Sequence, residues 1–91
     1  MIGVTERARQ ELKRILSANV DMPQARLRLM PGDQGELGLG IDIESPEDQI
    51  VEYKGSRVLV IERGLAASLK GIMLDVDDTP NGPQLVVVQA S

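Results

Sequence analysis

The sequence contains no cysteine and no histidine, and Tyr53 is its only aromatic residue. Without cysteine, these residues cannot form a disulfide, bind a cluster through thiolates or supply a thiol nucleophile. Without histidine, they cannot build a histidine-based triad or a histidine proton shuttle. Because no other nucleophile and base stand out as a pair, the sequence predicts a protein that is not an enzyme.

Long hydrophobic runs are also missing. The longest aliphatic runs cover residues 58–61 and 85–88, which are far too short to cross a membrane. The first residues lack the apolar core of a signal peptide. A chain of 91 residues is long enough for one domain and too short for two. We therefore expect a single cytoplasmic domain that does not bind membranes.

The net charge of −4 is spread unevenly along the chain. Residues 1–28 carry a net charge of +3, whereas the remaining residues carry −7. Such asymmetry favours docking on an oppositely charged protein partner, although a solvated surface is the simpler interpretation. Nucleic acid is not expected as a partner, because the chain is acidic and lacks stacking aromatics. The candidate partner-binding residues are the six basic ones in this segment: Arg7, Arg9, Lys13, Arg14, Arg26 and Arg28.

Hydrophobic periodicity predicts a helix over residues 6–18, with Thr5 as its N-cap. A short helix over 65–70 is predicted to end at Gly71. Alternating apolar residues predict strands at 25–29, 37–44 and 72–77, and further strands are expected at 49–53, 57–62 and 85–89, with a connecting loop at 78–83. This order predicts an α+β, mainly β fold with a compact sheet that folds over on itself.

The glycines and the carboxylates of the chain do not have the spacing of a phosphate loop or a calcium loop. Glycines at 32, 35, 38 and 40 lack phosphate-loop spacing, and Gly38 and Gly40 instead indicate a bend or close approach in a strand. A calcium loop that started at Asp77 would place Val88 where a glutamate is needed. The carboxylates of residues 44, 47 and 48 lie in a polar Ser-Pro turn, which predicts a surface loop.

The order and spacing of these segments resemble the HesB-like family, the A-type iron–sulfur cluster carriers. The resemblance runs nearly end to end and implies a HesB-like domain over residues 1–91, which in this family often forms dimers or tetramers. It rests on Val-Thr-Glu-Arg-Ala-Arg at 4–9, Arg-Leu-Arg-Leu at 26–29, Pro-Glu-Asp-Gln-Ile-Val at 46–51, Tyr-Lys-Gly at 53–55, Arg-Val-Leu-Val at 57–60, Leu-Lys-Gly at 69–71 and Leu-Asp-Val at 74–76.

The resemblance also implies where a cluster would be held. Members of this family use one cysteine in the loop after the first long strand and two in a C-terminal Cys-Gly-Cys. Here the first position falls on or beside Gln34, and the pair has no counterpart up to Ser91. Because cluster iron prefers thiolate, no cofactor is expected for this chain.

Two functions from different classes follow. The first is a non-catalytic accessory or regulatory module of iron–sulfur assembly, which binds protein partners through the basic residues or the 32–36 loop. The alternative is a weak binder of iron or a small ligand through Asp33, Gln34 and Glu36, or through the carboxylates at 75–78.

Val86 and Val88 also suggest an apolar edge strand, which predicts a homo-oligomer. Tyr53 fits either a partner contact or a core ring with its hydroxyl at the rim.

Overall fold

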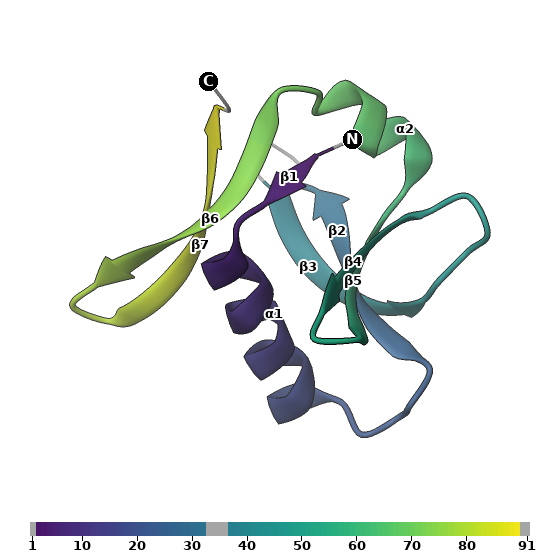
Figure 1. Ribbon diagram of the computed structural model, residues 1–91, viewed down its shortest axis with the longest axis horizontal. Helices are drawn as coiled ribbons and strands as arrows, with labels where there is room; N and C mark the ends of the chain where they lie inside the picture. Colours follow the sequence, from purple (N-terminus) through teal and green to yellow (C-terminus); the bar gives the residue numbers. More distant parts are fainter. Residues whose placement is uncertain (1, 33–36, 90–91) are drawn as a thin grey trace.

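The computed structural model describes residues 2–32 and 37–89, which form two helices and seven strands (Figure 1). This content confirms the predicted α+β, mainly β class. In chain order the elements are β1 (Gly3–Val4), α1 (Glu6–Asn19), β2 (Ala25–Pro31), β3 (Leu37–Ile43), β4 (Gln49–Tyr53), β5 (Ser56–Ile61), α2 (Arg63–Ser68), β6 (Ile72–Thr79) and β7 (Gly82–Gln89).

The strands form two mixed sheets. One has four strands in the order β3-β2-β5-β4, and the other has three in the order β1-β6-β7. In each sheet one pair is parallel, β2 with β5 and β1 with β6, and the remaining pairs are antiparallel. The predicted fold-over is therefore made by two separate sheets. Figure 1 shows the β6–β7 hairpin reaching out to one side of the molecule.

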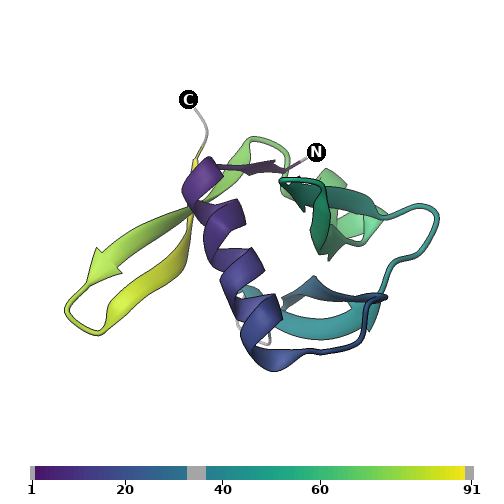
Figure 2. The same cartoon turned by 60° about the horizontal axis from the view of Figure 1, so that its bottom comes forward.

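Helix α1 stands between the two sheets and contacts strands of both (Figure 2). It begins at the predicted N-cap, where Thr5 accepts a hydrogen bond from the Ala8 backbone N–H at 3.1 Å. Its apolar stripe buries Ala8 and Leu12 completely. The core that they join includes Leu27 and Leu59 from the four-stranded sheet and further side chains from the three-stranded sheet. Burial against both sheets stabilises a helix that would be marginal alone.

The hairpin of β4 and β5 is confirmed, with its turn at Lys54 and Gly55. Both turn residues have positive φ, at 50° and 84°, which suits the backbone twist of a tight hairpin. Tyr53 ends β4 half-buried against the core, and the Lys54 ammonium lies 5.3 Å from its ring centroid. The Tyr53 ring therefore packs against the edge of the hydrophobic core.

Several boundaries differ from the sequence prediction. The segment 78–83, predicted as a loop, extends both strands of the β6–β7 hairpin, so that only a tight turn between Thr79 and Gly82 remains. Helix α2 begins two residues earlier than predicted, because the Glu62 side chain caps it by accepting from the Leu65 N–H at 2.8 Å. The two-residue strand β1 was not predicted, since it is too short to show any periodicity.

Candidate interaction surfaces

The six basic residues predicted to bind a partner fall into three groups, and four of the six form ion pairs with carboxylates. Arg28 and Arg26 point to the outer face of the four-stranded sheet, because their β2 neighbours Leu27 and Leu29 are buried on the inner face. The side chains on α1 lie on the opposite side of that sheet. Partner binding by the six residues stays a prediction.

Arg28 is held by two carboxylates, one on β3 and one in the segment that follows it. It donates to Asp42 at 2.8 Å, to Asp48 at 2.7 Å and to the Ile43 carbonyl at 3.0 Å. Its side chain is 15% exposed and that of Asp48 only 4%. The hydrogen bond and charge of Arg28, together with the Ser45 N–H, lower the pKa of the Asp48 carboxyl, although burial opposes this shift. Arg28 thus fastens the 44–48 segment over the sheet.

Glu44 links two basic residues beside this cluster. Its carboxylate pairs with Arg57 and lies 3.4 Å from Arg26 Nε. That nitrogen is buried and has no hydrogen-bond partner among the described residues, so the 3.4 Å contact is an ion pair without hydrogen-bond geometry. Arg26 Nη1 donates instead to the Pro23 carbonyl at 2.7 Å. Of the predicted surface-loop carboxylates, Asp48 is therefore buried, Glu44 is half-buried and Glu47 is exposed.

The basic residues of α1 lie on two sides of the helix. Arg7 donates to both oxygens of Asp78 on β6, and Arg14 pairs with Glu11 within the helix. These contacts lower the pKa of each carboxyl partner. On the other side, Arg9 donates to backbone carbonyls of Val4 and Glu52, and Lys13 donates to the Ser56 hydroxyl at 3.3 Å.

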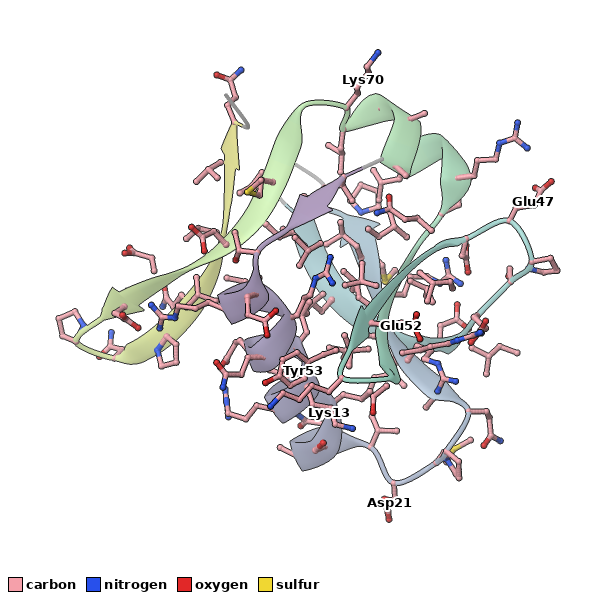
Figure 3. All side chains as sticks on the ribbon, in the orientation of Figure 1. Lys13, Asp21, Glu47, Glu52, Tyr53 and Lys70 are labelled. Atoms are coloured by element: carbon pink, nitrogen blue, oxygen red, sulfur yellow. The ribbon has the colours of Figure 1, made fainter. Side chains whose placement is uncertain are left out.

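Lys13 lines a groove of about 440 Å³ between the end of α1 and the β4–β5 turn. Its charged side chains are Lys13, Arg26, Arg57 and Asp21. Glu44 is paired with both arginines, whereas Lys13 is bonded only to a hydroxyl among the described residues. Figure 3 shows Lys13 near Asp21 and Tyr53 at the end of the molecule opposite Lys70. The groove therefore carries three basic side chains and one acidic one.

The carboxylates proposed as metal ligands are placed only in part. Asp33, Gln34 and Glu36 lie outside the described residues, and so does most of the 32–36 loop. Of the 75–78 carboxylates, Asp75 accepts hydrogen bonds from Thr5 and Val76, and Asp78 is paired with Arg7. Within residues 2–32 and 37–89, no three histidine, cysteine, aspartate or glutamate side chains gather as a metal site would require.

Apolar side chains are exposed on both of the longer edge strands, β3 and β7. Val87 and Val88 are exposed on β7, while Val86 is half-buried. On β3 the exposed side chains include Ile41 and Ile43. Leu37 and Leu39 face Leu85 and Val87 across an apolar cleft of about 240 Å³ between the sheets. The sequence predicted the β7 edge but not the β3 edge. The β3 sequence Leu-Gly-Leu-Gly-Ile-Asp-Ile was a usable signal, because it has no proline or lysine and only one charged residue to protect an edge.

Two solved structures share this architecture. One is the crystal structure of IscA with the [2Fe-2S] cluster, at 22% identity and a TM-score of 0.63, covering 98% of this chain and 85% of that one. The other is Escherichia coli SufA, involved in biosynthesis of iron-sulfur clusters, at 14% identity and a TM-score of 0.69, covering 97% and 84%. Neither a protein-family model nor a curated protein sequence matches the chain.

At these identities the likeness establishes the fold. This chain has the fold of the A-type iron–sulfur carriers, which confirms the predicted HesB-like fold. More particularly, this chain has that fold with no cysteine among its 91 residues. No helix among the described residues is long and apolar enough to span a membrane.

Proposed function

We propose that this protein is a non-catalytic accessory or regulatory module of iron–sulfur cluster assembly, which acts through protein contacts and carries no cluster. The observation that supports this most is the combination of the carrier fold with a sequence that has no thiol. Loss of the thiolates removes the ligands of a cluster but leaves the fold, and one fold can host functions other than cluster binding.

The residues present do not fit an iron–sulfur cluster. Clusters are held by thiolates, and the 91 residues offer none. Gln34 stands at or beside the position of the first cysteine in the resembled family, and its neutral amide is a poor ligand for cluster iron. The described carboxylates do not gather into a group that would replace the missing ligands. No step of the proposed function therefore passes through a bound cluster.

The basic groove at the end of α1 is the surface that we assign to the partner. Glu44 offsets only one of the two arginine charges and Asp21 lies in the same groove, so together with Lys13 the groove keeps a net positive charge that attracts an acidic segment. Lys13 is the basic side chain there that pairs with no carboxylate among the described residues. The Ser56 hydroxyl and the exposed turn at Gly55 add polar groups at the same place. Electrostatic docking of this kind mainly raises the association rate, and salt weakens it.

The docking test compares two lysines at opposite ends of the molecule. Lys13→Glu is expected to weaken binding to a [2Fe-2S]-loaded A-type carrier or its assembly partners by about 10-fold at low salt. Lys70→Glu makes the same charge change far from the groove and is expected to leave binding unchanged (Figure 3). Equal effects of the two variants, or binding that ignores salt, would show that the groove is not the docking surface.

The cluster test is anaerobic incubation with iron and sulfide, followed by desalting and measurement of bound iron, sulfide and visible absorption. We expect neither to be retained. Stoichiometric sulfide with cluster absorption would overturn the proposal. Iron without sulfide, lost in the Asp33→Ala/Glu36→Ala double variant, would favour the alternative function of a weak metal binder with oxygen ligands.

A further inference from the structure

Strand β3 is a free edge of the four-stranded sheet (Figures 1 and 2). Its seven residues pair with β2 on one side, and no strand of the described part of the chain pairs with the other side. A free edge presents a row of backbone N–H and C=O groups that are ready to bind another strand. The question is which strand suits it.

The inner face of β3 carries side chains of a kind usually buried. Leu39 lies opposite Leu29 and Ile41 opposite Leu27, and directly opposed residues share a face of the sheet. Leu27 and Leu29 are 2% and 4% exposed, whereas Leu39 and Ile41 are 38% and 56% exposed. The buried apolar face of β2 therefore continues onto β3, where Leu85 and Val87 of β7 cover Leu37 and Leu39 only in part.

The edge also lacks the usual protection against strand pairing. Strand β4 has a bulge after Val51 and an exposed glutamate, and β7 begins with Gly82 and Pro83. Strand β3 has no proline, no lysine and no bulge in its pairing with β2. Its single charge, Asp42, is bonded to Arg28 on the outer face. Inward charges, prolines and bulges are how most proteins keep an edge from pairing.

The order of residues in β3 is complementary to itself. Read from Gly40 outward, the strand meets leucine or isoleucine at the first position on either side, glycine or aspartate at the second and leucine or isoleucine at the third. We infer that two copies of this chain dimerise by antiparallel pairing of β3 with β3, on a two-fold axis at Gly40. Only an axis at Gly40 pairs all seven residues of both strands.

This register makes favourable pairs throughout. Leu39 lies opposite Ile41 of the second copy, which is an apolar cross-strand pair on the inner face. Asp42 lies opposite Gly38 of the second copy and meets no second carboxylate. A shift of the axis to Asp42 would place the two carboxylates against each other, at a cost in free energy. Repulsion between the two carboxylates therefore disfavours the register centred on Asp42. Every other register is disfavoured because it pairs fewer than seven residues of each strand.

The ends of the paired strands add contact with the other sheet. Ile43 of the second copy lies opposite Leu37, and Leu37 lines the cleft that Val87 closes from β7. Ile43 is 57% exposed and Val87 is 45% exposed in the single chain. Dimerisation would cover both. A two-fold axis gives the same contact twice, as a closed dimer requires.

Sedimentation tests whether the edge self-associates. The wild-type protein is expected to form dimers at concentrations on the order of 100 µM, and Ile41→Lys is expected to raise the dimer dissociation constant at least ~10-fold, because symmetry places two lysines in one interface. Val88→Lys makes the same change at a similarly exposed position on β7 and is expected to keep the dimer. Circular dichroism confirms that both variants fold.

Cross-linking tests the register, which the absence of native cysteine makes direct. An oxidised mixture of Leu39→Cys and Ile41→Cys chains is expected to form a disulfide between copies. Each variant alone is expected to form little, because diagonal neighbours on paired strands lie about 7–8 Å apart and a disulfide needs less than about 7 Å. A mixture of Leu39→Cys and Ile43→Cys serves as the mismatched control.

Several outcomes would overturn the inference. A monomer at the highest concentration would end it, and so would a dimer that survives Ile41→Lys but is lost in Val88→Lys. A mismatched pair that cross-links best would reject the axis at Gly40. If the protein is a monomer and its β3 edge binds a strand of another protein, that protein and not a second copy is the partner of this edge. None of these results depends on the proposed role in cluster assembly, so the two can fail separately.

Discussion

Asp48 and Arg28 form a nearly buried ion pair, with 2.7 Å between Asp48 Oδ2 and Arg28 Nη2. The two residues are 20 positions apart in the chain, and the same carboxylate oxygen also accepts the Ser45 N–H at 2.8 Å. The contact fastens the segment after β3 across the outer face of the sheet, where Val60 is fully buried. Arg28 therefore acts first as a structural residue.

Replacing Asp48 with asparagine is expected to destabilise the protein. The substitution removes a charged hydrogen-bond acceptor and leaves Arg28 with one carboxylate, which costs about 1–3 kcal/mol for bonds of this kind. Urea unfolding of the two proteins measures the loss. Glu47→Gln is the control, because its partner Arg63 is solvent-exposed and such pairs contribute less than about 1 kcal/mol. Equal effects of the two substitutions would contradict the structural role.

The same pair predicts a dependence of stability on pH. The Arg28 guanidinium, with help from the Ser45 N–H, holds the pKa of the Asp48 carboxyl below its usual value. A lowered folded-state pKa adds stability above the ordinary carboxyl pKa of about 4, and this stability is lost as the pH falls through the lower folded-state value. The difference in unfolding free energy between wild type and Asp48→Asn should therefore be largest near neutral pH and shrink in acid. A difference that stays constant from neutral to acidic pH would reject this cause.

The sequence predicted α1 well because its signals are local. A threonine cap and an apolar stripe lie within a few turns, and Thr5 and Leu12 occupy the places that they predict. The turn of β6–β7 was missed for the opposite reason. Residues 78–83 are nearly all turn-forming types, and only the ladder between two strands shows that Asp78 pairs with Pro83. Pairing across a hairpin outweighed local propensity.

The roles of the basic residues were harder to predict. Arg28 was interpreted as a docking residue because its charge could be read from the sequence, while its carboxylate partners lie 14 and 20 positions away. A partial signal existed, because pairing β2 with β3 as a hairpin places Arg26 opposite Asp42. Contacts of the 44–48 segment follow from tertiary folding and have no periodicity. The residues predicted as ligand positions, Asp33, Gln34 and Glu36, lie outside the described residues.

Thr5 is expected to stabilise the junction of α1 and β6. Its hydroxyl oxygen accepts a hydrogen bond from the Ala8 N–H, and its O–H donates to Asp75 Oδ1 at 2.9 Å. Thr5→Ala should lower the unfolding free energy by about 1–2 kcal/mol, as loss of an N-cap does, and Thr5→Ser should keep most of it. Thermal and urea unfolding compare the three proteins. If serine destabilises as much as alanine, the methyl group and not the hydroxyl stabilises this junction.

Gly40 and Gly38 provide a matched pair on β3. A Cβ built on Gly40 would lie 2.6 Å from Met30 Sδ, whereas one on Gly38 meets nothing within 4 Å. Gly38→Ala should therefore stabilise the fold by about 0.4–1 kcal/mol through loss of freedom in the unfolded chain.

Gly40→Ala should fall short of this gain by about 1 kcal/mol, because the Met30 side chain has to move. The shortfall should disappear when both glycine variants are compared in a Met30→Ala background, which a double-mutant cycle by urea unfolding measures. Measurements at low protein concentration keep self-association out of the comparison. A shortfall that persists without the Met30 side chain would show that the backbone at Gly40, and not this contact, requires glycine.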